Sequence, residues 1–135
     1  MVKHKAKILI IDDDPDFADA VTIILESALY DVVSASNAEE GKEKIFQTKP
    51  DLILLDVMMD SLFDGFSLCH SLKTSEEYKE FRGIPIILVS AVKEKVGSGF
   101  QFKSEDYGFA KPDDYLDKPV KPGELIARIE RLLKK

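Results

Sequence analysis

The chain has 135 residues, which is enough for one hydrophobic core and too few for two domains of ordinary size. Hydrophobic residues make up 44% of it and charged residues 33%, a balance typical of a folded domain and not of a disordered segment. The formal net charge of −6 argues against direct nucleic-acid binding, because phosphate backbones are bound by clustered Lys and Arg. We therefore expect a single domain over residues 1–135, with a short tail at 1–6, no second domain and no nucleic-acid partner.

The sequence gives no sign of a membrane segment or of an oxidising compartment. No apolar run approaches the roughly 20 residues that a spanning helix needs, and the first residues lack the pattern of a signal peptide. The single cysteine, Cys69, has no disulfide partner and no Cys or His neighbours at zinc spacing. We expect a cytoplasmic protein without a membrane partner, in which Cys69 is a small buried hydrophobic residue.

Strand and helix patterns alternate along the chain. Segments rich in aliphatic and β-branched residues predict five strands, at residues 7–11, 30–35, 51–55, 84–89 and 114–117. Apolar positions at three- and four-residue spacing predict helices at 17–29, from about 38 to 47, around 66–72 and from 122 onward. Glycines interrupt residues 93–112, so we expect an irregular connection there with at most a short fourth helix.

This alternation predicts an α/β fold. Strands that are apolar throughout and are joined by helical crossovers form a parallel sheet with helices on both faces, because right-handed crossovers leave no other compact arrangement. The expected architecture is a doubly wound sheet of five parallel strands, built from five βα units.

The polar residues that could bind a ligand or take part in a reaction come directly after the predicted strands. Asp12 and Asp13 end the first strand, Asp56 the third and Ser90 the fourth, and Lys118 follows the fifth. These ends share one edge of an open sheet, the edge where such folds bind ligands. Three carboxylates in one place repel each other unless a cation neutralises them, and oxygen ligands without His or Cys favour Mg²⁺. The edge is therefore predicted to be a metal site that can receive a phosphoryl group.

In this respect the sequence resembles the receiver domain of two-component response regulators. Four motifs carry the resemblance, in the expected order and over nearly the whole chain: IIDDDPD, DLILLDVMM, IPIILVSA and DYLDKPVKP. The resemblance implies a flavodoxin-like (βα)5 fold with strand order 2-1-3-4-5. It also implies a sensor histidine kinase or a histidine phosphotransfer protein as phosphodonor, and a downstream protein that the sequence does not identify.

The resemblance assigns roles to individual residues. It implies that Asp56 is the phosphoacceptor and that Asp12, Asp13, Asp56 and the backbone carbonyl of Met58 hold Mg²⁺. Phosphoryl transfer needs in-line positioning and charge neutralisation, which such a site supplies. The chain would then be a phosphoacceptor switch that catalyses only its own phosphorylation and dephosphorylation, and not an enzyme acting on a metabolite.

The same resemblance implies a switch at the fourth and fifth strands. Lys118 would pair with the phosphoryl oxygens and Ser90 would hydrogen-bond to one of them. If Ser90 moves toward the phosphoryl group, Tyr115 can fill the space that it leaves, which changes a protein-binding surface. A cis peptide bond is expected between Lys118 and Pro119.

Other interpretations of these residues stay open at this point. The acids from Asp12 to Asp14 also suit a helix entry, where the helix dipole favours negative charge. A Mg²⁺-dependent phosphohydrolase could use Asp56 as its nucleophile, but the chain has Met58 where such enzymes want an acid. A pseudo-receiver that is never phosphorylated is a further alternative, and a flavin-binding module another. Met58 and Val92 flank the expected path of water without a hydrogen-bonding side chain, which predicts slow autodephosphorylation.

Overall fold

The computed structural model describes residues 5–57, 59, 64–91, 108 and 110–134. At its centre lies a parallel sheet of five strands in the order β2-β1-β3-β4-β5, which confirms the predicted order. The strands are β1 (Lys7–Ile11), β2 (Asp31–Ala35), β3 (Leu52–Asp56), β4 (Ile86–Ser90) and β5 (Asp114–Asp117). The irregular connection with a shortened fourth helix was predicted for a segment of which 92–107 and 109 lie outside the described residues.

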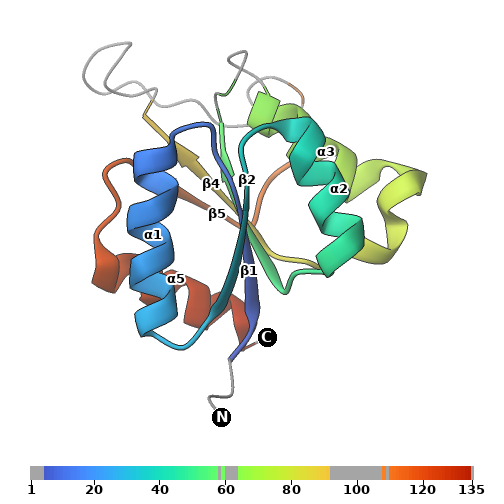
Figure 1. Ribbon diagram of the computed structural model, residues 1–135. Coiled ribbons are helices and arrows are strands. Elements are labelled where there is room, and N and C mark those ends of the chain that lie inside the picture. Colours follow the sequence, from blue (N-terminus) through green and yellow to red (C-terminus); the bar gives the residue numbers. More distant parts are fainter. Residues whose placement is uncertain (1–4, 58, 60–63, 92–107, 109, 135) are drawn as a thin grey trace.

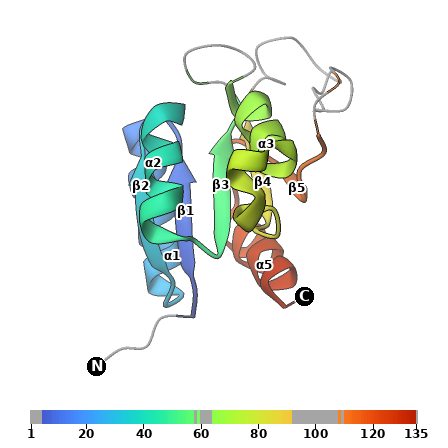
Figure 2. The same cartoon turned by 90° about the vertical axis from the view of Figure 1, so that its right-hand side faces the viewer.

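Helices cover both faces of the sheet, as expected for a doubly wound fold. They are α1 (Pro15–Ser27), α2 (Ala38–Thr48), α3 (Asp64–Thr74) and α5 (Pro122–Leu133), together with a 3₁₀ helix, η1 (Glu76–Phe81). The first and last of these, α1 and α5, lie on one face, and α2 and α3 lie on the other (Figures 1 and 2). Among the described residues, no helix is both long and apolar enough to cross a bilayer.

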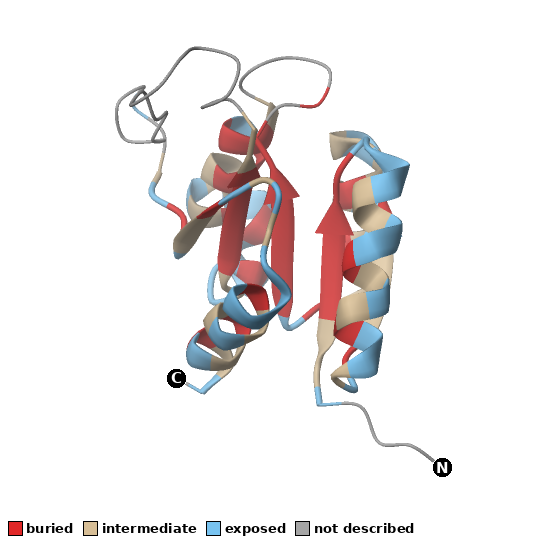
Figure 3. Ribbon diagram, turned by 90° about the vertical axis from the view of Figure 1, so that its left-hand side faces the viewer, coloured by how far each residue is buried: buried red, intermediate tan, exposed pale blue. Residues whose placement is uncertain are grey.

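The sheet separates two apolar clusters. Its strands β1, β3 and β4 are buried almost throughout, and the helices turn exposed faces outward (Figure 3). The cluster under α1 and α5 includes Ile8, Ile10, Val21, Leu25, Leu54, Ile87, Val89, Leu125 and Ile129. The cluster under α2 and α3 includes Leu9, Ile11, Ile45, Ile53, Leu55, Phe66, Cys69, Leu72 and Leu88. Burial on both faces explains why β1, β3 and β4 are apolar at successive positions and not only at alternate ones.

The helix starts follow from local polar residues. The Asp14 carboxylate accepts hydrogen bonds from the backbone N–H groups of Asp16 at 3.0 Å and Phe17 at 3.3 Å, and so caps α1. Asn37 caps α2, as predicted, by accepting from the N–H of Glu40 at 2.8 Å. The Glu40 carboxylate in turn accepts from the N–H of Ser36 at 2.7 Å and from the Ser36 hydroxyl at 3.0 Å, and these two hydrogen bonds from Ser36 lower the pKa of Glu40.

Two strand boundaries differ from the prediction for identifiable reasons. Strand β4 begins at Ile86 and not at residue 84, because Pro85 has no N–H to donate to a ladder, although its carbonyl accepts from Ile53 at 3.0 Å. Tyr30 precedes β2, because its N–H donates to the carbonyl of Leu25 at 3.0 Å and closes the end of α1. These hydrogen bonds end the helix and start the strands.

The register of the sheet brings the polar strand ends together. Ile11 pairs with Leu55, so the next residues on these two strands, Asp12 and Asp56, come side by side. Ser90 pairs with Asp117, which places Lys118 just beyond the end of β4. Parallel strands in register therefore bring residues from distant parts of the sequence to one edge.

Candidate functional site

The site lies where the chain reverses its direction of travel across the sheet. From β1 the chain moves outward to β2, whereas from β3 it moves to β4 on the other side, so the crossover helices diverge between β1 and β3. Such a divergence leaves a crevice outside the carboxyl ends of the two strands. Asp12 follows β1 and Asp56 ends β3, so both carboxylates lie at this crevice.

Three carboxylates meet at the crevice. Oxygens of Asp12, Asp13 and Asp56 all lie within 4.8 Å of one another. Asp12 is 3% exposed and Asp56 is 5% exposed, while Asp13 is exposed. Asp14 is not part of this group, because its carboxylate caps α1 and its own N–H donates to Oδ1 of Asp12 at 2.9 Å. The acidic run after β1 thus divides into a helix cap and a cluster.

Lys118 is the cation beside this cluster. Its Nζ lies 2.9 Å from Oδ2 of Asp12 and 3.9 Å from Oδ2 of Asp56, and its side chain is only 17% exposed. The backbone N–H of Lys118 donates to the carbonyl of Ser90 at 2.9 Å, and the peptide bond from Lys118 to Pro119 is cis. The ammonium also lies over the ring of Phe17, 4.4 Å from its centre, a contact that the sequence analysis did not predict.

The donor set fits a hard divalent cation. Three carboxylates and one ammonium carry formal charges of −3 and +1, which leaves two negative charges unbalanced. Oδ2 of Asp12 is buried and accepts no hydrogen bond from the described residues. The ammonium of Lys118, 2.9 Å away, forms an ion pair with it but does not have the geometry of a hydrogen bond. Carboxylate oxygens are the kind of ligand that Mg²⁺ prefers. The fourth expected ligand, the carbonyl of Met58, lies outside the described residues.

The expected switch residues lie on the strands next to the cluster. Ser90 is the last residue of β4 and is half-buried. Tyr115 lies on β5 opposite Leu88, and its half-buried ring packs against the cluster under α2 and α3. Val92, from which slow autodephosphorylation was predicted together with Met58, is outside the described part of the chain.

Gly65 lies against the backbone that carries Asp56, although no role was predicted for it from the sequence. A Cβ at this position would lie 2.6 Å from the Cα of Val57 and would overlap the carbonyl of Asp56. Its N–H donates to the carbonyl of Val57 at 2.8 Å. Helix α3 therefore starts in direct contact with the backbone that carries Asp56, and only glycine fits there. The Asp64-Gly65 pair after the third strand was the available signal.

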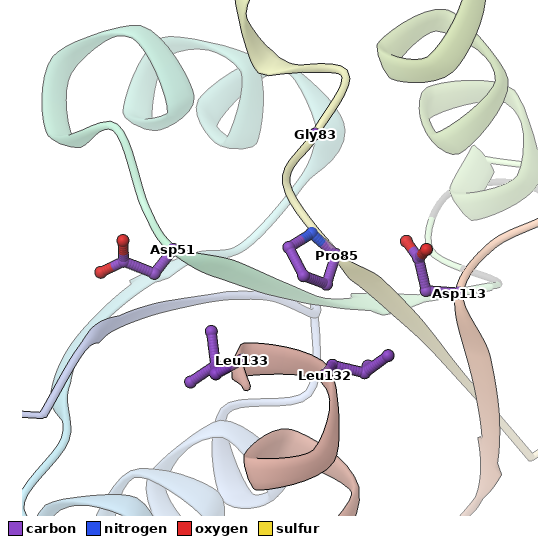
Figure 4. A pocket seen from close by; sticks show the side chains of 6 residues that line it. All are labelled: Asp51, Gly83, Pro85, Asp113, Leu132 and Leu133. Carbon is purple, nitrogen blue, oxygen red and sulfur yellow. The ribbon is translucent and has the colours of Figure 1, made fainter. Parts of the chain in front are cut away.

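A pocket of about 270 Å³ lies at the opposite edge of the sheet (Figure 4). It is lined by Asp51, Gly83, Pro85, Asp113, Leu132 and Leu133. These residues precede β3, β4 and β5 or end α5, so the pocket is at the amino ends of the strands. None of the predicted site residues lines it.

The chain is similar to curated regulators from bacteria. It is 38% identical over 130 residues to the DNA-binding dual master transcriptional regulator RpaA of Synechocystis sp., covering 96% of this chain and 49% of that protein. It is 30% identical over 131 residues to the DNA-binding response regulator MtrA of Mycolicibacterium smegmatis, covering 97% of this chain and 52% of that protein. The chain thus spans about half the length of these relatives.

These relatives correct one expectation. The acidic charge of the chain led us to exclude a nucleic-acid partner, and that conclusion was wrong, because the relatives are DNA-binding regulators. The net charge of −6 could not exclude such a partner, because it describes a chain about half as long as those proteins. The charge of a chain that matches half of a relative carries no information on what the other half of that relative binds.

A solved structure and a family model agree with the fold. The receiver domain protein (CheY-like) from Methanospirillum hungatei superimposes with a TM-score of 0.77 at 29% identity, covering 95% of this chain and 93% of that one. The model of the response regulator receiver domain matches residues 8–130. That range runs from β1 to α5 and includes every strand end of the carboxylate site. The chain therefore belongs to the response regulator receiver domain family of two-component signalling.

Proposed function

We propose that this receiver domain, formed by residues 1–135, accepts a phosphoryl group on Asp56 from a histidine kinase or a histidine phosphotransfer protein. The proposal rests on one observation, the meeting of three carboxylates within 4.8 Å with the ammonium of Lys118 beside two of them. In the transfer, a carboxylate oxygen of Asp56 forms a bond to phosphorus. The bond between phosphorus and the histidine nitrogen of the donor breaks, and its electron pair leaves with the imidazole.

Asp12, Asp13 and Asp56 would hold Mg²⁺, together with the carbonyl of Met58 as the family resemblance implies. The bound ion supplies positive charge against the phosphoryl oxygens as they approach the carboxylates. Two observations support this assignment. The cluster carries two unbalanced negative charges, and Oδ2 of Asp12 accepts no hydrogen bond from the described residues. Without a cation, the carboxylates repel a phosphoryl group, so transfer should depend on the metal.

Lys118 and Ser90 would bind the transferred group. The Lys118 ammonium, already 3.9 Å from an Asp56 oxygen, can pair with a phosphoryl oxygen after a small movement away from Asp12. Ser90 ends the strand next to β3 and directly follows Val89, which pairs with Asp56. A move of Ser90 toward the phosphoryl group would open space that the ring of Tyr115 then fills.

This exchange of Ser90 and Tyr115 is the proposed output. Phosphorylation favours the conformation that binds the phosphoryl group better, and the surface around β4 and β5 changes with it. The names of the relatives suggest control of transcription as the purpose. We therefore propose that the receiver regulates a DNA-binding partner, whether that partner belongs to the same protein or to another one. The domain itself catalyses only the gain and loss of its own phosphoryl group.

Intact-mass measurement after incubation with acetyl phosphate and Mg²⁺ tests the acceptor. The wild-type chain should gain one phosphoryl group, and Asp56→Asn should gain none. Omission of Mg²⁺ should reduce the uptake strongly. Asp113→Asn, at the other edge of the sheet, is a matched control and should behave as wild type.

Two results would contradict the proposal in different ways. Equal uptake by wild type and Asp56→Asn would mean that another residue is the acceptor. No uptake by the wild-type chain, from either acetyl phosphate or a phosphorylated histidine donor, would favour a pseudo-receiver that acts only by binding other proteins.

A further inference from the structure

Phe17 lies beside the site but belongs neither to the acidic cluster nor to the residues that the family resemblance names. Its backbone N–H donates to the Asp14 carboxylate at 3.3 Å, which holds it in the first turn of α1. Its side chain is half-buried and packs against the cluster under α1 and α5. Cap and packing together leave the ring little freedom, and Nζ of Lys118 lies 4.4 Å from the ring centre.

We propose that Phe17 is a positioning residue, whose ring holds the ammonium of Lys118 at the site before a phosphoryl group arrives. This inference rests on the proposed role of Lys118 as the cation that meets the phosphoryl oxygens. Lysine is a compact charge on a flexible four-carbon chain, so the ammonium needs a second restraint to stay in one place. The negative face of an aromatic ring attracts a cation, most strongly where water is largely excluded, as around this 17% exposed side chain.

The ring also differs in an important way from Asp12, the nearer of the two carboxylates beside Lys118. The carboxylate of Asp12 attracts the ammonium at 2.9 Å, but the same carboxylate is an expected metal ligand. The attraction of Asp12 for Lys118 must weaken when its charge is shared with a divalent cation. Phe17 carries no charge and ligates no metal, so its attraction for the ammonium persists in both conditions. Preorganised cations of this kind lower the barrier, because they need no rearrangement as charge develops.

Proton NMR tests the contact without any phosphodonor. Protons above an aromatic ring are shifted upfield, so the ε-methylene resonances of Lys118 should lie upfield of those of the exposed lysines. Phe17→Leu keeps an apolar side chain and removes the ring, and the upfield shift should disappear. Phe17→Tyr keeps the ring and should retain it. Unchanged Lys118 resonances in Phe17→Leu would overturn the proposal.

The rate of Asp56 phosphorylation by acetyl phosphate at saturating Mg²⁺ tests the consequence. Phe17→Leu should be slower than wild type by about fivefold, which is the loss expected for a partly buried cation–π contact. Phe17→Tyr should restore the rate. Ile24→Ala, two turns further along α1 in the same apolar cluster, should reduce stability without slowing the reaction.

These measurements distinguish a failure of the positioning role of Phe17 from a failure of the function proposed for Asp56. A wild-type rate in Phe17→Leu, or an equal slowing in Ile24→Ala, would overturn the positioning role. A wild-type chain that is never phosphorylated would overturn the function proposed for Asp56, and the positioning role with it. In that case the Lys118 resonances would still report on the contact between ring and ammonium.

Discussion

The two edges of the sheet both carry aspartates, but at the amino edge, where the strands begin, Asp51 and Asp113 each bind the start of a neighbouring strand. There, Asp51 accepts the N–H of Lys7 at 2.8 Å, at the beginning of β1. Asp113 accepts both the N–H of Ile86, at the beginning of β4, and the ammonium of Lys73, each at 2.8 Å. These hydrogen bonds join neighbouring strands, and so they stabilise the fold.

At the carboxyl edge the aspartates instead face one another. Asp12, Asp13 and Asp56 converge within 4.8 Å, and the ammonium of Lys118 contacts two of them. Like charges at this distance destabilise a folded chain unless a ligand supplies the opposite charge. The number of carboxylates therefore does not identify the functional edge of the sheet. What identifies it is charge that the surrounding chain leaves unbalanced.

The largest difference between the edges should appear when a methyl group is added to a glycine. At the carboxyl edge, Gly65→Ala forces a Cβ against the backbone of Asp56 and Val57, which should cost about 3 kcal/mol of unfolding free energy. The rate of phosphorylation should fall as well, because the backbone of the acceptor must shift. At the amino edge, Gly83→Ala meets no atom within 4 Å and should be nearly neutral. Urea unfolding of both variants checks this, and equal stabilities would contradict it.

Magnesium should act on one edge only. At a hundred times its dissociation constant, a ligand that binds only the folded chain adds about 2.7 kcal/mol to the unfolding free energy. We expect a gain of that order for wild type and for Asp51→Asn, and little gain for Asp13→Asn. Thermal unfolding at increasing Mg²⁺ concentration measures it. A full magnesium response in Asp13→Asn would remove this residue from the set of ligands.

Asp113→Ala should show the opposite behaviour. The variant loses the hydrogen bond to Ile86 and the ion pair to Lys73, at a cost of about 1–2 kcal/mol in stability. Asp113→Asn, which keeps an acceptor for Ile86, should recover part of that loss. Both variants should be phosphorylated at the wild-type rate, measured under conditions where they are folded. A slower reaction would mean that the two edges are coupled.

The smallest effect concerns Cys69, which lies on α3 and is buried in the apolar cluster under α2 and α3. Burial raises the pKa of its thiol to about 12, so the fold favours the neutral thiol. An unfolded cysteine thiol has a pKa of about 8.5. This contribution to stability is therefore complete below that pH and is lost as the pH rises from there toward the folded value of about 12. At pH 9 the loss is about 0.8 kcal/mol. Wild type and Cys69→Ala should therefore differ in the slope of stability against pH above 8.5, and parallel curves would contradict the shift.

Much of the fold could be predicted because its signals are long. Five strand patterns and four amphipathic helix patterns predict the layers of the fold. The polar residues after the strands predict which end of the sheet carries the candidate site. The short element η1 was not predicted, because six residues hold too little periodicity. Its Tyr78 and Phe81 pack against the ring of Phe46, and such contacts across the fold are invisible in a sequence.

The site was predictable in outline and not in its internal division. Three consecutive aspartates follow β1, and nothing in that run distinguishes the helix cap, Asp14, from the cluster residues Asp12 and Asp13. The distinction comes from the register of β1 with β3, which only the folded sheet defines. The contact between Lys118 and Phe17 joins opposite ends of the chain, so no local pattern could indicate it.

The alignment of strand ends has a consequence for quality control in the cell. The proposed acceptor, its acidic neighbours and the nearby lysine come from the ends of β1, β3 and β5, so they meet only when the central sheet is complete. A nascent, damaged or partly unfolded copy lacks the assembled centre and should stay chemically silent toward a phosphodonor. Only intact molecules should therefore report a stimulus, which protects the pathway from spurious signals.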